Sequence, residues 1–422
     1  MTPSTAVSAE PTASAPGPMT APGTQATTAN LAIAPASATK SSNSRIFNFN
    51  AGPSYLPEEI IRQIQEDIWN FKGTGLGIME HSHRAKAYDE VIVEAEADIR
   101  AIANIPKNYR ILFMTGGSSS QNFIVPTNLL KTGQTADHII TGYWGQRSFD
   151  DAHAVAKQVG GTIHLAATSA DTNHSYIPSS QQTRFSPAAA YLHFTSNNTI
   201  YGTQWRNPDG SERLPEAPAG VPLVCDMCSD IYSRPTDISK FGLVYASAQK
   251  NLGTTGATIV IVRDDLVERA DPALPRMLQY RTFVKDASMP NTPPAFAIYT
   301  VGLMAKWIKA QGGLTALHTR NVEKAQLVYD ALDSTSDFWI AHARKQDRSL
   351  MNIVFRARAA SGSTTAEALD QRFTSEAKAH AMDGLAGHRA AGGMRASVYN
   401  AFPKAGCKAL AEFIVDFANR NG

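Results

Sequence analysis

The chain has 422 residues, of which 43% are hydrophobic and 18% charged, and its formal net charge is +2. These values are ordinary for a soluble globular protein, and so weak a charge gives no electrostatic reason to expect nucleic acid or an anionic membrane as a partner. No apolar run approaches the ~20 residues that a membrane-spanning helix needs.

Residues 1–44 consist mostly of Ala, Thr, Ser and Pro, and the first aromatic residue is Phe47. Such a segment cannot bury enough apolar surface to offset the entropy of ordering, so we expect a disordered tail. An organelle transit peptide is the alternative, because the segment is Ser-rich and acid-poor. Transit peptides are usually Arg-rich, however, and the first arginine is Arg45.

Helical and strand patterns alternate through residues 57–262. Pro57 opens a predicted helix with apolar residues at helical spacing, and a second helical pattern covers residues 88–105. The predicted strands are short apolar runs: RILFM (110–114), HIITGYW (138–144), TIHLAA (162–167), AYLHFTS (190–196), VPLVCDM (221–227), LVYASA (243–248) and ATIVIV (257–262). Strands separated by helices indicate a mainly parallel α/β sheet. The last run follows its predecessor so closely that we expect it to be an antiparallel neighbour.

After Asn291 the pattern changes to long helices with few strands. Helices are predicted at 295–311, 314–332, 365–380 and 404–420, and strands at 351–356 and 394–399. This arrangement indicates a smaller α+β domain that is joined to the sheet by a long helix.

Lys250 stands between the apolar strand that ends in YASA and a turn rich in Gly and Thr. A lysine there can keep its ammonium in solvent or pair with an acid. Alternatively, burial lowers its pKa, and the neutral amine attacks an aldehyde to form a Schiff base.

Asp226 is the last residue of the predicted strand VPLVCD, and its presence makes a Schiff-base role for Lys250 more specific. A carboxylate at the carboxyl end of a sheet strand lies at the edge where ligands bind. Pyridoxal 5′-phosphate (PLP) needs such a group, because an aspartate that keeps the pyridine nitrogen protonated makes the ring an electron sink. A strand-end aspartate that caps the following turn remains the simpler alternative.

The stretch TGGSSSQ (115–121) leads from a strand into a helix, where backbone N–H groups and Ser118 and Ser119 suit a phosphate. A plain helix cap is as good an interpretation. Trp144 ends a predicted strand and can stack on a planar ring, and Thr199 and Gln249 can hydrogen-bond its substituents.

Anion-binding groups occur in two further segments. Arg389 and Arg395 lie among small residues, where an arginine can clamp a carboxylate, and His83 and Arg84 suit a second anion. His81, His388 and Arg395 have the simpler interpretation of paired or solvated groups. Cys225 and Cys228 have the C-x-x-C spacing, but no second ligand pair accompanies them, so no metal site is predicted.

Several strings resemble phosphoserine aminotransferase, a family of fold-type I PLP-dependent enzymes, and they follow in order from Phe47 to the C-terminus. They are FNAGPSYLP (49–57), MEHSHR (79–84), GYW (142–144), ASAQKN (246–251), NTPP (291–294) and GHRAAGGMRASVYNA (387–401). The resemblance implies a large PLP-binding domain at 58–312, built on a mainly parallel seven-stranded sheet. It also implies a small C-terminal α+β domain at 313–422 and an N-terminal arm at 45–57 that packs with the small domain.

The resemblance also implies a role for each matched residue. Lys250 and Asp226 are catalytic: Lys250 bonds to the PLP aldehyde, and Asp226 holds the ring nitrogen. Trp144 stacks on the ring, Thr199 contacts its phenolic oxygen side, and Ser118, Ser119 and Gln249 contact the cofactor phosphate. Asn291 and Thr292 reach that phosphate from the partner subunit of a homodimer. Among substrate-binding residues, Arg389 holds the α-carboxylate, and the partner's His83 and Arg84 hold the distal phosphate or γ-carboxylate.

Four positions depart from the pattern of some members: Ala51, Ser119, Asn198 and Asp383. They leave the PLP chemistry intact but leave the phosphate-side contacts open.

The implied reaction transfers an amino group between L-glutamate and 3-phosphohydroxypyruvate in L-serine biosynthesis. The sequence leaves open whether 4-phosphohydroxythreonine is a second substrate, in PLP biosynthesis. Three cysteines form no disulfide framework, so a cytoplasmic location is expected. The alternatives are another fold-type I enzyme, such as a small-amino-acid aminotransferase or a cysteine desulfurase, and a non-catalytic PLP-binding protein.

Overall fold

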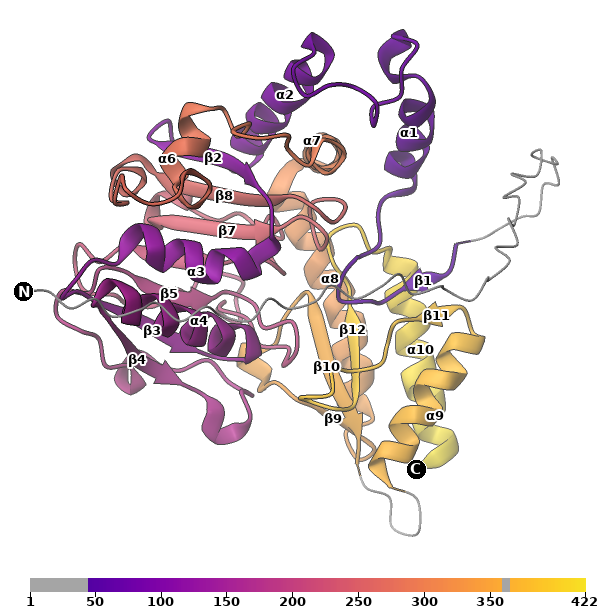
Figure 1. Ribbon diagram of the computed structural model, residues 1–422. Coiled ribbons are helices and arrows are strands. Elements are labelled where there is room, and N and C mark those ends of the chain that lie inside the picture. The colour runs from indigo at the N-terminus through magenta and orange to yellow at the C-terminus, as the bar shows by residue number, and fades with distance from the viewer. Residues whose placement is uncertain (1–44, 359–364) are drawn as a thin grey trace, which may run out of the picture. The chain divides into compact units, whose positions relative to one another are not determined.

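The computed structural model describes residues 45–358 and 365–422 (Figure 1). The predicted disordered tail, residues 1–44, lies outside these ranges. Within them, no helix combines the length and apolar character that crossing a bilayer requires.

A seven-stranded sheet forms the centre of the fold, as the resemblance implied. Its strands, in spatial order, are β2 (Tyr109–Met114), β8 (Thr258–Arg263), β7 (Leu243–Ser247), β6 (Leu223–Asp226), β5 (Leu192–Thr195), β3 (Thr135–Ile140) and β4 (Thr162–Thr168). β8 runs antiparallel to both of its neighbours, β2 and β7, and the other neighbouring strands are parallel. The predicted antiparallel strand is therefore confirmed.

Helices cover both faces of this sheet because successive strand residues point to opposite sides. In β2, Ile111 and Phe113 belong to the core with α2 and α7, whereas Leu112 and Met114 belong to the core with α3 and α4. Figure 1 shows α3 and α4 together on one face. The helices of this region are α1 (Glu58–Trp69), α2 (Lys86–Ile102), α3 (Gly117–Leu129), α4 (Tyr143–Val159), α5 (Asp264–Val267), α6 (Tyr280–Lys285) and α7 (Ala295–Ala310).

A second core forms around an antiparallel sheet of three strands, ordered β12 (Met394–Ser397), β10 (Asn352–Ala357) and β9 (Trp339–Ala341). It packs against α8 (Gly313–Ser334), α9 (Ala366–Ala379) and α10 (Lys404–Asn421), with Trp339, Phe373 and Phe417 at its centre. Short 3₁₀ helices occur in the connections: η1 (Phe71–Gly73), η2 (Ala170–Thr172), η3 (Ser180–Gln182), η4 (Ile238–Lys240), η5 (Arg276–Leu278) and η6 (Lys345–Asp347).

The N-terminal segment after Arg45 lies against this second core. Its strand β1 (Phe47–Asn48) pairs in parallel with β11 (Met382–Asp383). The Phe49 ring is fully buried, and its centroid lies 4.5 Å from that of Phe402. The segment then continues toward the carboxyl edge of the large sheet, where Ser54 N–H donates to the backbone carbonyl of Gln249 at 3.0 Å.

One predicted strand ends earlier than the sequence suggested. HIITGYW was expected to be a strand as far as Trp144, but β3 stops at Ile140 and Tyr143 already begins α4. Trp144 therefore lies in the first turn of a helix and not at the end of a strand. Gly142 precedes α4 directly, and a side chain has no room there, because a Cβ would lie 2.5 Å from Asn198 Oδ1 and 3.2 Å from the ring of Tyr201.

Candidate active site

The carboxyl ends of the parallel strands meet at one edge of the large sheet, which is where open α/β sheets bind ligands. A cavity of about 310 Å³ lies there. Its walls come from the segments that follow β2, β3, β5, β6 and β7: Gly116, Gly117, Ser118, Ser119, Asn122, Trp144, Thr195, Asn197, Thr199, Asp226, Cys228, Ser229, Ser247, Gln249 and Lys250. The predicted lysine, the predicted acid and the predicted phosphate loop therefore share one cavity.

Lys250 lies in the turn after β7, and its Nζ donates a hydrogen bond to Thr199 Oγ1 at 3.0 Å. Burial by itself lowers the pKa of this amine, which was the sequence-based expectation. The pKa of Lys250 is nevertheless raised, because attraction to the acidic groups of Cys228, Tyr399 and Asp226 outweighs burial. The pKa shift is therefore opposite to the one that burial alone would produce.

Asp226 is the last residue of β6 and is 6% exposed. Its Oδ1 accepts the backbone N–H of Cys228 at 2.8 Å, and no described residue hydrogen-bonds Oδ2. Burial raises the pKa of Asp226 to about 6, although the Cys228 N–H and Lys250 both oppose the rise. The cavity wall thus carries an acid with a free oxygen and an increased affinity for a proton.

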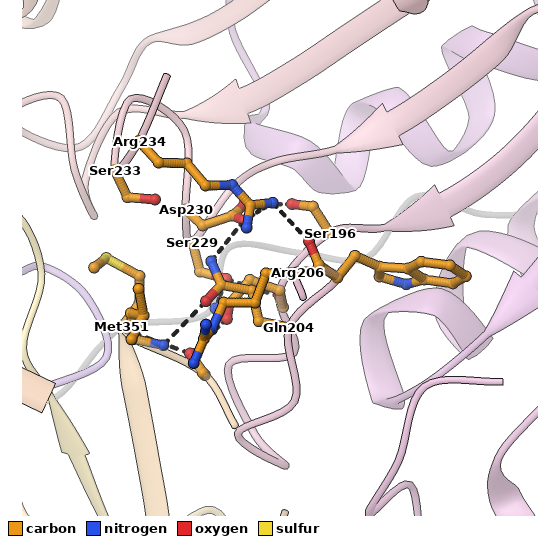
Figure 2. Close-up of polar contacts among 12 residues, drawn as sticks. Ser196, Gln204, Arg206, Ser229, Asp230, Ser233, Arg234 and Met351 are labelled. Atoms are coloured by element: carbon orange, nitrogen blue, oxygen red, sulfur yellow. Dashed lines mark hydrogen bonds and ion pairs between the residues drawn. The ribbon is translucent and has the colours of Figure 1, made fainter. Parts of the chain in front are cut away.

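A second buried acid, Asp230, adds its negative charge to the causes that raise the pKa of Asp226. The hydroxyl of Ser196 connects the backbone of Asp226 with the carboxylate of Asp230: it contacts the Asp226 backbone carbonyl at 3.1 Å. It also hydrogen-bonds Asp230 Oδ1 (Figure 2). Gln204 Nε2 donates to Asp230 Oδ2 at 3.0 Å, and Arg234 Nη2 lies 4.0 Å from the same oxygen. Burial raises the pKa of Asp230, and Arg234 opposes that rise.

The loop between β2 and α3 offers backbone donors at the other end of the cavity. Gly116 and Gly117 have φ values of 89° and 69°, in the left-handed region that favours glycine. A Cβ on Gly116 would lie 2.7 Å from the Cβ of Ser120. Gly117 is already the first residue of α3, a helix of 13 residues, so Ser118 and Ser119 lie in its first turn, where an anion is favoured.

Ser247 is a site residue that the sequence reasoning missed. Its Oγ accepts the Ser118 N–H at 2.6 Å and lies 3.0 Å from Ser118 Oγ. It is the last residue of β7, and the rule that strand carboxyl ends line the site could have found it.

Two further functional candidates are Arg395, for which the sequence favoured the simpler interpretation of a paired or solvated group, and Tyr399, which the sequence reasoning missed. The Arg395 Nε is buried without a hydrogen-bond partner among the described residues. Burial lowers the pKa of Arg395, and Tyr399 opposes that effect. Both groups also influence the pKa of Lys250, so they lie near its ammonium.

Five predicted residues do not line this cavity. Arg389 is exposed in the loop between β11 and β12, and Arg84 is exposed just before α2. His83 is partly buried, and Asn291 and Thr292 are exposed, with the Asn291 Nδ2 donating only to the neighbouring Thr292 carbonyl at 3.1 Å. His83, Arg84, Asn291 and Thr292 were all expected to serve the partner's site, which one chain does not test.

The departures from the family pattern occupy defined places. Asn198 is 2% exposed, and its Nδ2 donates to Thr141 Oγ1 at 3.0 Å and Thr203 Oγ1 at 2.9 Å. The Ala51 carbonyl accepts a hydrogen bond from Tyr399 Oη at 2.8 Å. Within residues 45–358 and 365–422, no cluster of three or more His, Cys, Asp or Glu side chains could hold a metal ion.

Comparisons with known proteins agree over nearly the whole described chain. Residues 46–410 match the family model described as aminotransferase class-V. A phosphoserine aminotransferase of Herpetosiphon aurantiacus is 45% identical over 377 residues, 89% of this chain and 99% of that one. The structure of phosphoserine aminotransferase from Bacillus circulans subsp. alkalophilus aligns with a TM-score of 0.83 at 44% identity, covering 90% and 99% of the two chains. PLP-bound phosphoserine aminotransferase from Trichomonas vaginalis aligns at 0.81 and 34% identity, covering 88% and 99%.

Proposed function

Because this chain belongs to the phosphoserine aminotransferase family of class-V aminotransferases, we propose that it transfers an amino group reversibly between L-glutamate and 3-phosphohydroxypyruvate. The products are 2-oxoglutarate and O-phospho-L-serine, so the enzyme acts in L-serine biosynthesis. The observation that carries the proposal is that Lys250, Asp226 and the Gly117–Ser119 helix start line one cavity.

The unpaired groups of this cavity fit PLP, the cofactor of the family. Asp226 Oδ2 has no described partner and can accept a hydrogen bond from a protonated ring nitrogen. The N-terminus of α3, with Ser118, Ser119 and Gln249, can hold the phosphate, and Trp144 offers a ring face. When bound, PLP supplies an aldehyde that condenses with amines and a ring that withdraws electrons from the substrate α-carbon.

Lys250 Nζ is the general base of this chain that takes the proton from the substrate α-carbon and later returns one. Nζ must be a neutral amine to accept this proton, and burial, which disfavours the ammonium, supports that role. Thr199 Oγ1, 3.0 Å away, holds Nζ in place. Asp226, with a pKa raised to about 6 and Asp230 behind it, is a stronger proton acceptor for the ring nitrogen than an exposed aspartate.

The substrates need two anion sites, one for the α-carboxylate and one for the distal group. Arg395 is favoured for the α-carboxylate, because its Nε is a buried donor without a partner and it lies near Lys250. Arg389, the residue implied by the sequence, is exposed and remains the alternative. His83 and Arg84 are proposed to hold the distal phosphate or γ-carboxylate in the site of the partner subunit.

A homodimer is proposed on the same basis. Exposed apolar side chains occur shortly before His83 and Arg84 in the chain: Trp69 is 86% and Met79 64% exposed, and Ile68 and Leu76 are exposed as well. Contiguous exposed apolar surface in a soluble protein indicates a protein interface. A symmetric interface there brings His83 and Arg84 of one chain to the other, together with Asn291 and Thr292.

The buried cysteines argue against the desulfurase alternative. That reaction needs a cysteine on a mobile loop, whereas Cys225 and Cys407 are fully buried and Cys228 is 9% exposed. All three are unpaired, which also suits the proposed cytoplasmic location. A non-catalytic PLP-binding protein would not need the pair Lys250 and Arg395.

The test is a two-substrate assay with O-phospho-L-serine and 2-oxoglutarate, in which formation of L-glutamate is measured. Alanine with glyoxylate serves as the comparison pair, and 4-phosphohydroxythreonine as a second donor. We expect phosphoserine to give the highest kcat/KM. A higher value for alanine would assign the chain to another aminotransferase activity, and no transfer with any donor would support a pure binding protein.

A further inference from the structure

Helix α8 carries a lysine, Lys324, that is 3% exposed and forms no ion pair with any described carboxylate. Its Nζ donates instead to three consecutive backbone carbonyls, those of Val398 at 3.0 Å, Tyr399 at 2.6 Å and Asn400 at 3.3 Å. An ammonium has three donors, so all of them are used. A buried charge without a counter-ion is costly, and only this complete set of hydrogen bonds offsets the cost.

The three carbonyls belong to the turn that follows β12, and this turn leads directly to the active site. β12 carries Arg395, and α8 packs against β10, the strand that pairs with β12. The Tyr399 hydroxyl donates a hydrogen bond to the backbone carbonyl of Ala51. The next residue, Gly52, lies against the cofactor lysine: a Cβ on Gly52 would be 3.4 Å from Lys250 Cγ.

The turn also contacts the lysine loop itself. The Asn400 backbone N–H donates at 3.0 Å to the side-chain oxygen of Asn251, which is the residue after Lys250. Asn321, one helical turn before Lys324 on α8, donates to Asn400 Oδ1 at 2.9 Å. Two residues on one face of α8 therefore hold a turn that touches both the N-terminal arm and the cofactor lysine loop.

We propose that Lys324 is a positioning residue for amino transfer, which sets the place of Arg395 and Tyr399 relative to Lys250 by holding residues 398–400. This inference rests on the proposed function, and on Arg395 as the α-carboxylate site. A single charged group that binds three successive carbonyls fixes the orientation of the turn more firmly than separate neutral donors can, since hydrogen bonds to charged groups are the stronger ones.

The contact gives substrate binding a dependence on pH. Burial lowers the pKa of Lys324 to about 8, with Cys407 opposing and Arg320 assisting. Cys407 stays neutral in this range, because burial raises the pKa of its thiol to about 12. Above pH 8 the amine keeps two protons for three carbonyls, so one carbonyl loses its donor.

The test uses Lys324→Met, with the exposed Lys408→Met as the matched control. We expect KM to rise about tenfold for both L-glutamate and 3-phosphohydroxypyruvate. This rise corresponds to the loss of one charged hydrogen bond at the α-carboxylate site that the two substrates share. The Kd of PLP should stay within about twofold of the wild-type value. Glutarate, a dicarboxylate without an amine, should bind wild-type enzyme more weakly above pH 8, and the variant should lose this decline.

Unchanged KM values in Lys324→Met, or an equal loss of PLP affinity, would overturn the inference. Should Lys324→Met not fold, Asn321→Ala is the deciding variant, because it loosens the same turn and leaves the ammonium in place. An increase in KM for both substrates would support the proposal. Unchanged KM values would overturn it. Wild-type enzyme that fails to use phosphoserine rejects the proposed function instead, so the two failures are distinguishable.

Discussion

The side-chain nitrogen of Lys250 lies 3.0 Å from the hydroxyl oxygen of Thr199, which joins the turn after β7 to the segment after β5. The two residues are 51 positions apart in the chain. The contact holds the amine at the cavity wall. No other lysine among the described residues lines this cavity. Lys250 is therefore the single amine of the cavity lining that can bond to the cofactor aldehyde.

Replacing this amine should abolish turnover while leaving a cofactor site. Lys250→Ala is expected to lower kcat at least about 10³-fold, because the general acid and base is lost. After borohydride reduction, mass spectrometry should find PLP on the wild-type peptide that contains Lys250 and none on the variant. The exposed Lys157→Ala is the control. Covalent PLP on a different lysine of the wild type would contradict the assignment.

The acid of the cavity should make the protein without PLP less stable. The pKa of Asp226 is about 6 in the folded chain and 3.8 in the unfolded reference, so the folded state binds more protons between these values. Its contribution to stability therefore falls as pH rises from 3.8 through 6, and the loss is complete above about pH 6. Asp226→Asn removes this cost and keeps an acceptor for the Cys228 N–H.

At pH 7.5 without PLP, we expect Asp226→Asn to be more stable than wild type by about 3 kcal/mol, and by about half as much at pH 5. Urea unfolding of both proteins at both pH values measures this difference in the free energy of unfolding. The same variant should bind PLP more weakly, because an amide cannot neutralise a protonated ring nitrogen. A gap that is equal at the two pH values would show that charge on Asp226 is not its cause.

The strand pattern was sufficient to predict the position of the site, because the pattern alone places Asp226 and Lys250 at the ends of neighbouring strands. It could not predict the pKa of Lys250, which depends on Tyr399, 149 residues later, and on the buried position of Cys228. Trp144 was assigned to a strand because HIITGYW forms one mainly apolar run. The start of α4 at Tyr143 depends on tertiary contacts, such as the close packing of Gly142 against Asn198 and Tyr201, which a local pattern does not contain.

The choice between Arg389 and Arg395 shows the same limit. Both lie among small residues in one segment, and the sequence does not indicate which of them lies near Lys250. Pairing of Arg395 with Val354 in β10 fixes the orientation of one, and the loop leaves the other in solvent.

The two arginines should differ in their effect on substrate binding. Arg395→Ala is expected to raise KM for L-glutamate and 3-phosphohydroxypyruvate together, by about 10- to 100-fold, because both substrates carry the same α-carboxylate. Arg395→Lys should recover only part of this, since an ammonium cannot bind a carboxylate in a two-pronged manner. Steady-state kinetics on both variants and on Arg389→Ala decide the matter, and a larger effect at Arg389 would favour the residue implied by the sequence.

The proposed sharing of sites between subunits can be tested by mixing two inactive enzymes. Lys250→Ala lacks its own base, and Arg84→Ala lacks the anion site that it offers to its partner. In a mixed dimer with shared sites, one site carries both defects and the other carries neither. After denaturation and refolding of an equal mixture, half of the dimers are mixed, so about a quarter of wild-type activity should return.

The assay needs 3-phosphohydroxypyruvate far below the KM of Arg84→Ala, so that this parent contributes almost nothing. The two parents, refolded separately, are the controls. If each site instead used the Arg84 of its own chain, a mixed dimer would contain one site without base and one without the anion group. Its activity would not exceed the mean of the parents, and the shared site would be rejected even if the dimer itself persists.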